Sequence, residues 1–121
     1  MEKPKFEFYE RHNGHNEFLE FLENLPQKDQ AKLMAVIYKV QIHGLLTAIK
    51  MKWVKKVDDN IFELRSEVGN NIQRALYFHW KGSRYIITHG FSKKTQKTPR
   101  KEILHALAIY KEFEEENDAN S

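Results

Sequence analysis

The spacing of apolar residues predicts helices in the first third of the chain and strands in the middle. Apolar and charged residues alternate over 5–10, which predicts a short strand. Apolar residues at 18, 21, 22 and 25 follow the i, i+3, i+4, i+7 spacing of an amphipathic helix, which Pro26 should end. A second helix is predicted from Gln27 to a terminator at Gly44, and the short connection predicts a helical hairpin.

From Ile61 the pattern changes to period two or to unbroken apolar runs. Strands are predicted at about 61–67, 72–80 and 85–91, joined by hairpin turns. In the last two strands both the odd and the even positions are apolar, as expected for central strands covered on both faces. Residues 45–60 have no clear period, and no element is predicted there.

The last predicted helix begins at Thr98-Pro99, with Thr98 as N-cap, Pro99 at the first helical position and Glu102 in the first turn. The element order is strand, two helices, three strands and one helix. This order predicts an α+β fold, in which an N-terminal helical hairpin and a C-terminal helix pack on a small antiparallel sheet. We expect one domain over 1–116 and a frayed tail over 117–121.

Composition excludes several classes of protein. The 121 residues include no cysteine, which excludes a disulfide scaffold, a thiolate zinc site and a thiol nucleophile. No apolar run approaches the roughly 20 residues that cross a bilayer, and charges interrupt the N-terminus too often for a signal peptide. We therefore expect a cytoplasmic protein that does not bind membranes.

Positive charge is concentrated in one segment. The net charge is only +3, but residues 68–101 hold eight lysines and arginines and no acid. Such a segment favours a polyanion, because bound phosphates release condensed counterions. The alternative is that these cations pair with acids elsewhere, including Glu112 and Glu114–Glu116.

Four cations of this region could form a phosphate site. Arg65 and Arg74 lie in neighbouring predicted strands, and Lys93 and Lys94 follow the third strand. If they converge at one end of the sheet, the guanidinium groups could bind phosphate oxygens bidentately and stabilise a pentacovalent phosphorus.

The alternative for the two arginines is a structural role. Each could pair with Glu63 or Glu67, and spacing alone leaves both interpretations open. Arg74 also shares its strand face with apolar neighbours, so it must lie at the end of the strand to reach a substrate.

The basic loop 92–98 leads into the last helix, whose free N-terminal amides favour an anion. Lysines before the sheet would extend this surface, and Trp53 between them is either a core residue or a base-stacking platform, with core favoured. The side chains predicted to bind RNA are Lys52, Lys55, Lys56, Lys97, Arg100 and Lys101.

Histidine is the obvious proton-transfer group. His79 and His89 lie in adjacent predicted strands, and His89 could assist proton transfer, but a structural position in the core or at the sheet edge is favoured for it. No HExxH motif occurs, and residues 68–101 hold no carboxylate for a metal site. Walker, GxSxG and GxGxxG motifs are also absent, so we expect neither a metal nor another cofactor.

Several motifs in order resemble one known family. Phe62-Glu63-Leu64-Arg65, Arg74-Ala-Leu-Tyr77-Phe78 and His89-Gly90-Phe91-Ser-Lys93-Lys94-Thr95-Gln96-Lys97-Thr98-Pro99 are similar to the HigB-like, phage-derived branch of the RelE toxin superfamily. The resemblance covers about residues 5–115. It implies a RelE-like fold, a metal-independent ribonuclease that cuts mRNA in the A site of the small ribosomal subunit, and a helix-turn-helix antitoxin as partner.

The resemblance also assigns residues. The family's arginine of the second core strand corresponds to Arg74, its basic pair to Lys93 and Lys94, and Arg65 matches the ELR arginine. The founding members have strand lysines that Lys52, Lys55 or Lys56 would have to replace, and a tyrosine in the last helix that this chain lacks. The general base is therefore open among Tyr77, His89 and a lysine whose pKa other cations depress.

We expect an endoribonuclease toxin that cleaves mRNA through attack of a ribose 2′-hydroxyl on its own phosphate. One alternative keeps the fold without catalysis, as a basic module that binds RNA or an acidic protein. The other is a phage-derived nucleic-acid-binding regulator, which the lack of a recognisable helix-turn-helix disfavours.

Overall fold

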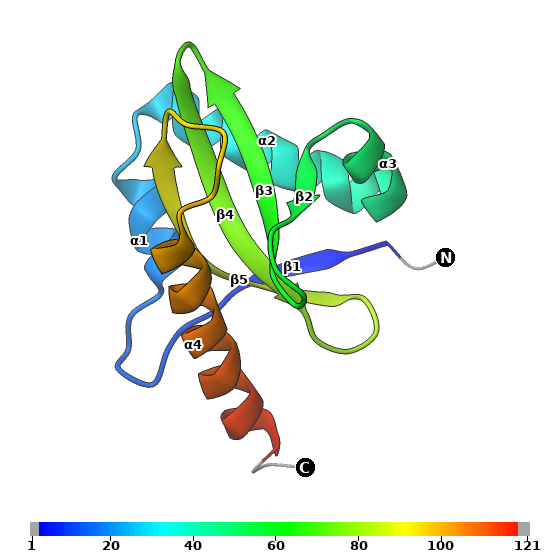
Figure 1. Ribbon diagram of the computed structural model, residues 1–121, viewed down its shortest axis with the longest axis vertical. Coiled ribbons are helices and arrows are strands. Elements are labelled where there is room, and N and C mark those ends of the chain that lie inside the picture. Colours follow the sequence, from blue (N-terminus) through cyan, green and yellow to red (C-terminus); the bar gives the residue numbers. More distant parts are fainter. Residues whose placement is uncertain (1–2, 119–121) are drawn as a thin grey trace.

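The computed structural model describes residues 3–118, in which five strands form one sheet in the order β1-β5-β4-β3-β2 (Figure 1). The elements are β1 (Lys5–Phe8), α1 (Glu17–Glu23), α2 (Gln27–His43), α3 (Leu45–Lys50), β2 (Val54–Lys56), β3 (Phe62–Val68), β4 (Asn71–His79), β5 (Arg84–Lys93) and α4 (Arg100–Asp118). The predicted α+β class, with helices near the N-terminus and one C-terminal helix, is confirmed, and the arrangement is consistent with a RelE-like fold.

The sheet is antiparallel except at one edge. Strands β2 to β5 pair antiparallel in chain order, whereas β1 pairs parallel with β5. A parallel pair requires a long crossover connection, and here the helices α1 to α3 and strands β2 to β4 separate the two strands. The predicted first strand is confirmed as β1, but its pairing with β5 could not be predicted from the local sequence pattern.

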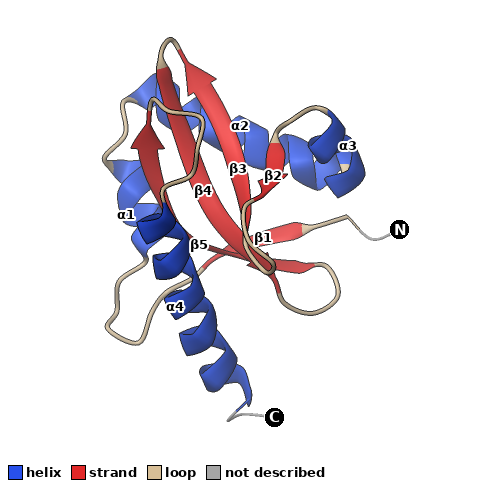
Figure 2. Cartoon of the chain, in the orientation of Figure 1, coloured by secondary structure: helices blue, strands red, loops and turns tan. Residues whose placement is uncertain are grey.

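Helices cover both faces of the sheet (Figure 2). On the first face, α1 and α2 bury a core that includes Phe18, Leu33 and Tyr77. On the second face, α4 packs Ile109 and Phe113 against the sheet. This double cover explains why β4 and β5 are apolar on both parities.

Three local predictions are corrected. Residues 45–60, for which no element was predicted, contain the short elements α3 and β2. Helix α4 begins at Arg100, so Thr98 is not its N-cap, and the Thr98 hydroxyl instead donates to Glu63 Oε1 at 2.8 Å. Helix α4 continues to Asp118, so the first two residues of the predicted frayed tail are helical, and 119–121 lie outside the described residues.

Gly90 lies against α1, and this contact predicts a packing defect. A Cβ atom at Gly90 would lie 2.3 Å from Cδ2 of Phe21, so Gly90→Ala is expected to cost about 1–3 kcal/mol of unfolding free energy. Urea unfolding would measure this cost. In a Phe21→Ala background the cost should largely disappear, and an equal cost in both backgrounds would show that packing is not its source.

Candidate nucleic-acid interface

Glu63 is the buried centre of the polar groups on the second face of the sheet. Residues 63 and 65 lie on one face of β3 because side chains alternate, and Arg65 stands opposite Arg74 in the register. The Arg65 Nε donates to Glu63 Oε2 at 2.7 Å, and Arg74 Nη1 lies 3.7 Å from Oε1. Because the carboxylate of Glu63 is fully buried, these two cations and Thr98 are what compensates its charge.

Arg74 is fully buried as well. Its Nη1 donates to the carbonyl oxygen of Lys97 at 3.1 Å, and its guanidinium lies 5.9 Å from the ring centroid of Phe91. Within residues 3–118, Nε and Nη2 of Arg74 have no hydrogen-bond partner. Burial lowers the pKa of Arg74, with partial compensation by Glu63, but a guanidinium stays protonated in proteins.

The loop between β5 and α4 covers Arg74. Gln96 accepts from Arg65 through both its backbone carbonyl and its side-chain Oε1, the latter at 2.8 Å from Nη1. These bonds, with the one from Arg74 to Lys97, hold the loop across the end of the sheet. The expectation that Arg74 lies at an accessible strand end is therefore not met in this structure, because the loop that follows β5 closes over it.

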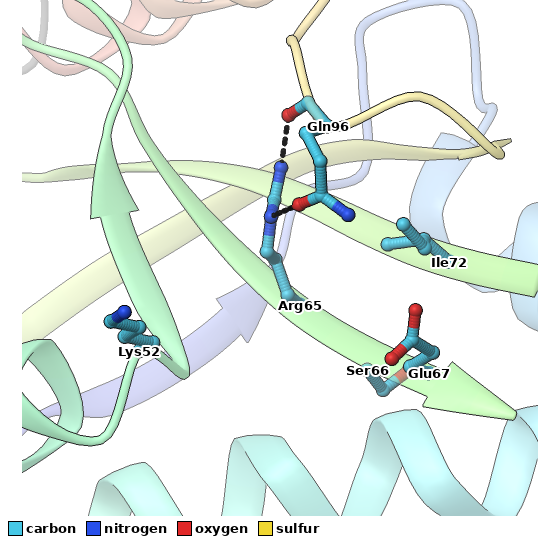
Figure 3. Close-up of a pocket in the computed structure, with 6 residues that line it drawn as sticks. All are labelled: Lys52, Arg65, Ser66, Glu67, Ile72 and Gln96. Atoms are coloured by element: carbon cyan, nitrogen blue, oxygen red, sulfur yellow. Dashed lines mark hydrogen bonds between the residues drawn. The ribbon is translucent and has the colours of Figure 1, made fainter.

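Arg65 lines an open pocket. Its side chain is 19% exposed, and the pocket beside it has a volume of about 200 Å³ (Figure 3). Figure 3 shows the Arg65 guanidinium held by Gln96, with Lys52 and Glu67 on either side. The remaining lining residues are Ser66 and Ile72. We call this cavity the Arg65 pocket.

A second cavity of about 330 Å³ shares Lys52 and Arg65 with the Arg65 pocket. It is also lined by Lys55 and Lys56 of the edge strand β2, which pairs with β3. Lys52 has a φ of 63°, a left-handed conformation that is uncommon for residues other than glycine. The three lysines predicted to extend the surface thus lie together with Arg65.

Arginines and lysines of the basic segment differ in their partners. Arg84 pairs with Glu7 at 2.6 Å, and Arg100 pairs with Asp58 at 3.4 Å. Across residues 3–118, the lysines of this segment form no ion pair. Four of them were predicted to bind RNA or to take part in catalysis, and all four are exposed: Lys93, Lys94, Lys97 and Lys101.

Within residues 3–118, two of the α4 acids that the alternative named form ion pairs with residues outside the basic segment. Glu112 pairs with Arg11 at 3.0 Å, and Glu116 lies 3.2 Å from His12. The arginines of the basic segment therefore do pair with acids elsewhere, namely Glu63, Glu7 and Asp58. The lysines do not, so the exposed surface of this segment is rich in lysine.

Tyr77 and His89 lie away from the Arg65 pocket. Tyr77 is buried on the first face of the sheet, where it stacks on Phe62 at 5.6 Å, and burial raises its pKa. His89 lies under α4, 3.1 Å from Glu102 and with its ring 4.6 Å from that of His105. The structure therefore does not bring these two candidate bases to Arg65, because β4 directs Tyr77 to the opposite face and α4 covers His89.

Acidification is expected to destabilise the fold in part through His89. Burial, then the neighbouring His105, lowers the pKa of His89, and Glu102 only partly opposes this. When the pKa of a histidine is lower in the folded state, the unfolded state binds the proton first as the pH falls. The stability that is present above the unfolded pKa of about 6.5 is therefore lost on acidification. His89→Gln should flatten the decline in urea-unfolding free energy between pH 7 and pH 5. The same change at the exposed His79 should not, and an unaltered slope in His89→Gln would contradict the assignment.

Sequence reasoning missed Gln96 as a ligand of Arg65, and Ser66 and Glu67 as lining residues. It considered Glu63 only as a partner that would make the arginines structural. Parity placed Glu63 beside Arg65, but only the loop contacts show that one buried carboxylate organises Arg65, Arg74 and Thr98.

The model of one protein family, described as phage-derived protein Gp49-like (DUF891), matches residues 20–111. The matched segment contains every residue of the two cavities described above. No curated protein matches the chain. Among residues 3–118, no three metal-binding side chains cluster, and no helix has the length and apolar character of a membrane span.

Proposed function

Because the chain belongs to the Gp49-like family of phage-derived proteins, which is associated with RelE-like toxins, we propose that it is an endoribonuclease toxin. Its substrate would be mRNA, cut on the small ribosomal subunit, and its partner a cognate helix-turn-helix antitoxin. The observation that carries this proposal is the pair of adjoining cavities around Arg65, into which three lysines from two further segments converge.

The proposed reaction is an in-line transesterification. The 2′-oxygen of a ribose bonds to the adjacent phosphorus while the bond from phosphorus to the 5′-oxygen breaks. The products are a 2′,3′-cyclic phosphate and a 5′-hydroxyl end, and the proton of the 2′-hydroxyl is finally balanced by the one that the 5′-oxygen gains. Charge grows on the phosphate oxygens in the transition state, so cations fixed beside them accelerate the step.

Arg65 would bind the scissile phosphate, since its guanidinium is partly exposed and already lies in the pocket. Gln96 would have to give up its bonds to Arg65 when the phosphate arrives. Lys52, with Lys55 and Lys56, would hold the flanking phosphates. Lys93 and Lys94 would stabilise the transition state or bind RNA from the loop, together with Lys97, Arg100 and Lys101.

Two further roles follow from the positions of the remaining candidates. Arg74 is assigned as a positioning residue, because its contact with Glu63 fixes the carboxylate that orients Arg65. The proton acceptor would be the carboxylate of Glu67, which lines the Arg65 pocket. Tyr77 and His89 do not line that pocket, and Lys52 is assigned to phosphate binding as a cation. Metal would not take part.

The test uses a short RNA and its copies with single 2′-deoxy substitutions. We expect cleavage that persists in EDTA, leaves a 2′,3′-cyclic phosphate and fails when the nucleotide 5′ of the cut is 2′-deoxy. The assay should be run with and without programmed ribosomes. RNA that is bound yet stays intact in both would favour a non-catalytic binding module, and cleavage of the 2′-deoxy substrate would exclude the proposed attack.

A further inference from the structure

The outer surface of α2 and α3 carries large apolar side chains that stay exposed among residues 3–118. Met34, Tyr38 and Ile42 are exposed and stand four residues apart on α2. Each is therefore displaced by only about 40° around the helix from the one before, and together they form a stripe. The stripe is separate from the buried face of α2, which carries Leu33, Val36, Ile37 and Val40.

The apolar surface continues in sequence onto α3, which starts directly after Gly44. Leu46 and Ile49 are 63% and 53% exposed, on a helix of six residues. Two cavities lie beside them. One of about 400 Å³ is lined by Leu46 and Tyr85, and one of about 210 Å³ by Ile49 and Tyr85, with Leu45 common to both. We call the five residues Met34, Tyr38, Ile42, Leu46 and Ile49 the α2–α3 surface.

The segment that carries this surface is rich in positive charge. Residues 27–56 contain seven lysines and one acid, Asp29. Asp29 is buried and accepts from Gln73 Nε2 at 2.7 Å, so it does not contribute an exposed carboxylate. Lys39, beside the stripe, lies over the ring of Trp53 at 5.4 Å. An exposed apolar surface bordered by cations is complementary to an apolar stripe bordered by acids.

We propose that the α2–α3 surface binds an amphipathic helix of a protein partner, with apolar side chains toward α2 and α3 and acidic side chains at its borders. A helix laid along a groove places side chains at i, i+3, i+4 and i+7, and the two cavities beside α3 would receive its larger anchors. This interface is independent of RNA cleavage and does not rest on the proposed function.

The position of the surface has a consequence for the Arg65 pocket. Helix α2 packs on the first face of the sheet, whereas Arg65, Arg74 and the loop over them lie on the second face. The two regions meet at α3 and the start of β2, because Ile49 and Val54 line both the apolar cavity and the lysine-lined cavity. The partner would therefore leave most of the basic surface open and approach it at α3.

The test uses the full chain and two synthetic helical peptides with the same leucine stripe, one bordered by glutamates and the other by lysines. Fluorescence anisotropy should show at least tenfold tighter binding of the glutamate peptide, with a difference that shrinks as salt is added. Leu46→Asp and Tyr38→Asp should each weaken this binding at least tenfold. Leu104→Asp, at a leucine of α4 that is 51% exposed, is the matched control and should not.

Other outcomes would overturn the proposal. Equal binding of both peptides, or equal loss in Leu104→Asp, would show that the α2–α3 surface is not selective. Binding to vesicles of phosphatidylserine and phosphatidylcholine that Leu46→Asp abolishes would assign the surface to a membrane. Self-association of the full chain in sedimentation, abolished by both Leu46→Asp and Leu104→Asp, would mean that a second copy's α4 occupies it.

Discussion

Replacing Arg65 with alanine is expected to reduce RNA cleavage by about 10²–10³-fold, the cost of removing one preorganised donor from the transition state of such a reaction. The Arg65 side chain is the guanidinium that lies in the pocket, held in place by Glu63 and Gln96. Arg65→Lys should recover only part of the rate, because an ammonium group cannot bind two phosphate oxygens as a fixed fork. Single-turnover cleavage of a short RNA would measure both variants.

Arg84→Ala supplies the matched control for this experiment. Arg84 is also a strand arginine paired with a glutamate, but it is exposed and lies where β5 begins, beside β1. Its loss should leave the cleavage rate unchanged and cost at most about 1 kcal/mol of stability. If Arg65→Ala cleaves as fast as Arg84→Ala while remaining folded by circular dichroism, Arg65 does not bind the scissile phosphate.

Replacing Glu63 is expected to have the largest effect on stability. Glu63→Ala removes the buried carboxylate that faces Arg74, whose guanidinium is itself fully buried and has two nitrogens without partners among residues 3–118. Leaving a buried charge without its counter-ion costs about 3–5 kcal/mol. Urea unfolding should show a loss of this size, and the Thr98 hydroxyl would lose its acceptor at the same time.

Two further variants separate the ion pair from the loss of a side chain. Glu67→Ala changes an exposed glutamate of the same strand and should alter stability by less than about 0.5 kcal/mol. A Glu63→Leu, Arg74→Met double variant removes both charges and should recover much of the stability that Glu63→Ala loses, because apolar replacements of buried pairs are often neutral. A double variant as unstable as Glu63→Ala would show that the charge pair is not the cause.

Much of the fold follows from local pattern. The bounds of α2 were predicted closely because Pro26 and Gly44 mark its ends, and β3 to β5 were predicted from period and turn residues. The short elements α3 and β2 were not predicted, because their conformation depends on packing against α2 and β3 more than on their own sequence.

The candidate site was predictable in its residue types and less so in its geometry. The clustering of charge suggested that Lys52, Lys55 and Lys56 extend the basic surface, and the structure places them in one cavity with Arg65. The burial of Arg74 could not be read from the sequence. It depends on bonds from β3 and β4 to Gln96 and Lys97, residues 31 and 23 positions away in the chain.

The most direct test of the RNA-cleaving account is to map RNA ends in cells after the protein is induced. We expect growth arrest accompanied by new 5′-hydroxyl ends within coding regions, which disappear in Arg65→Ala and persist in Arg84→Ala. Arrest without new ends, or new ends that persist in Arg65→Ala, would contradict the claim that the cations around the Arg65 pocket bind and cleave a phosphodiester bond of RNA.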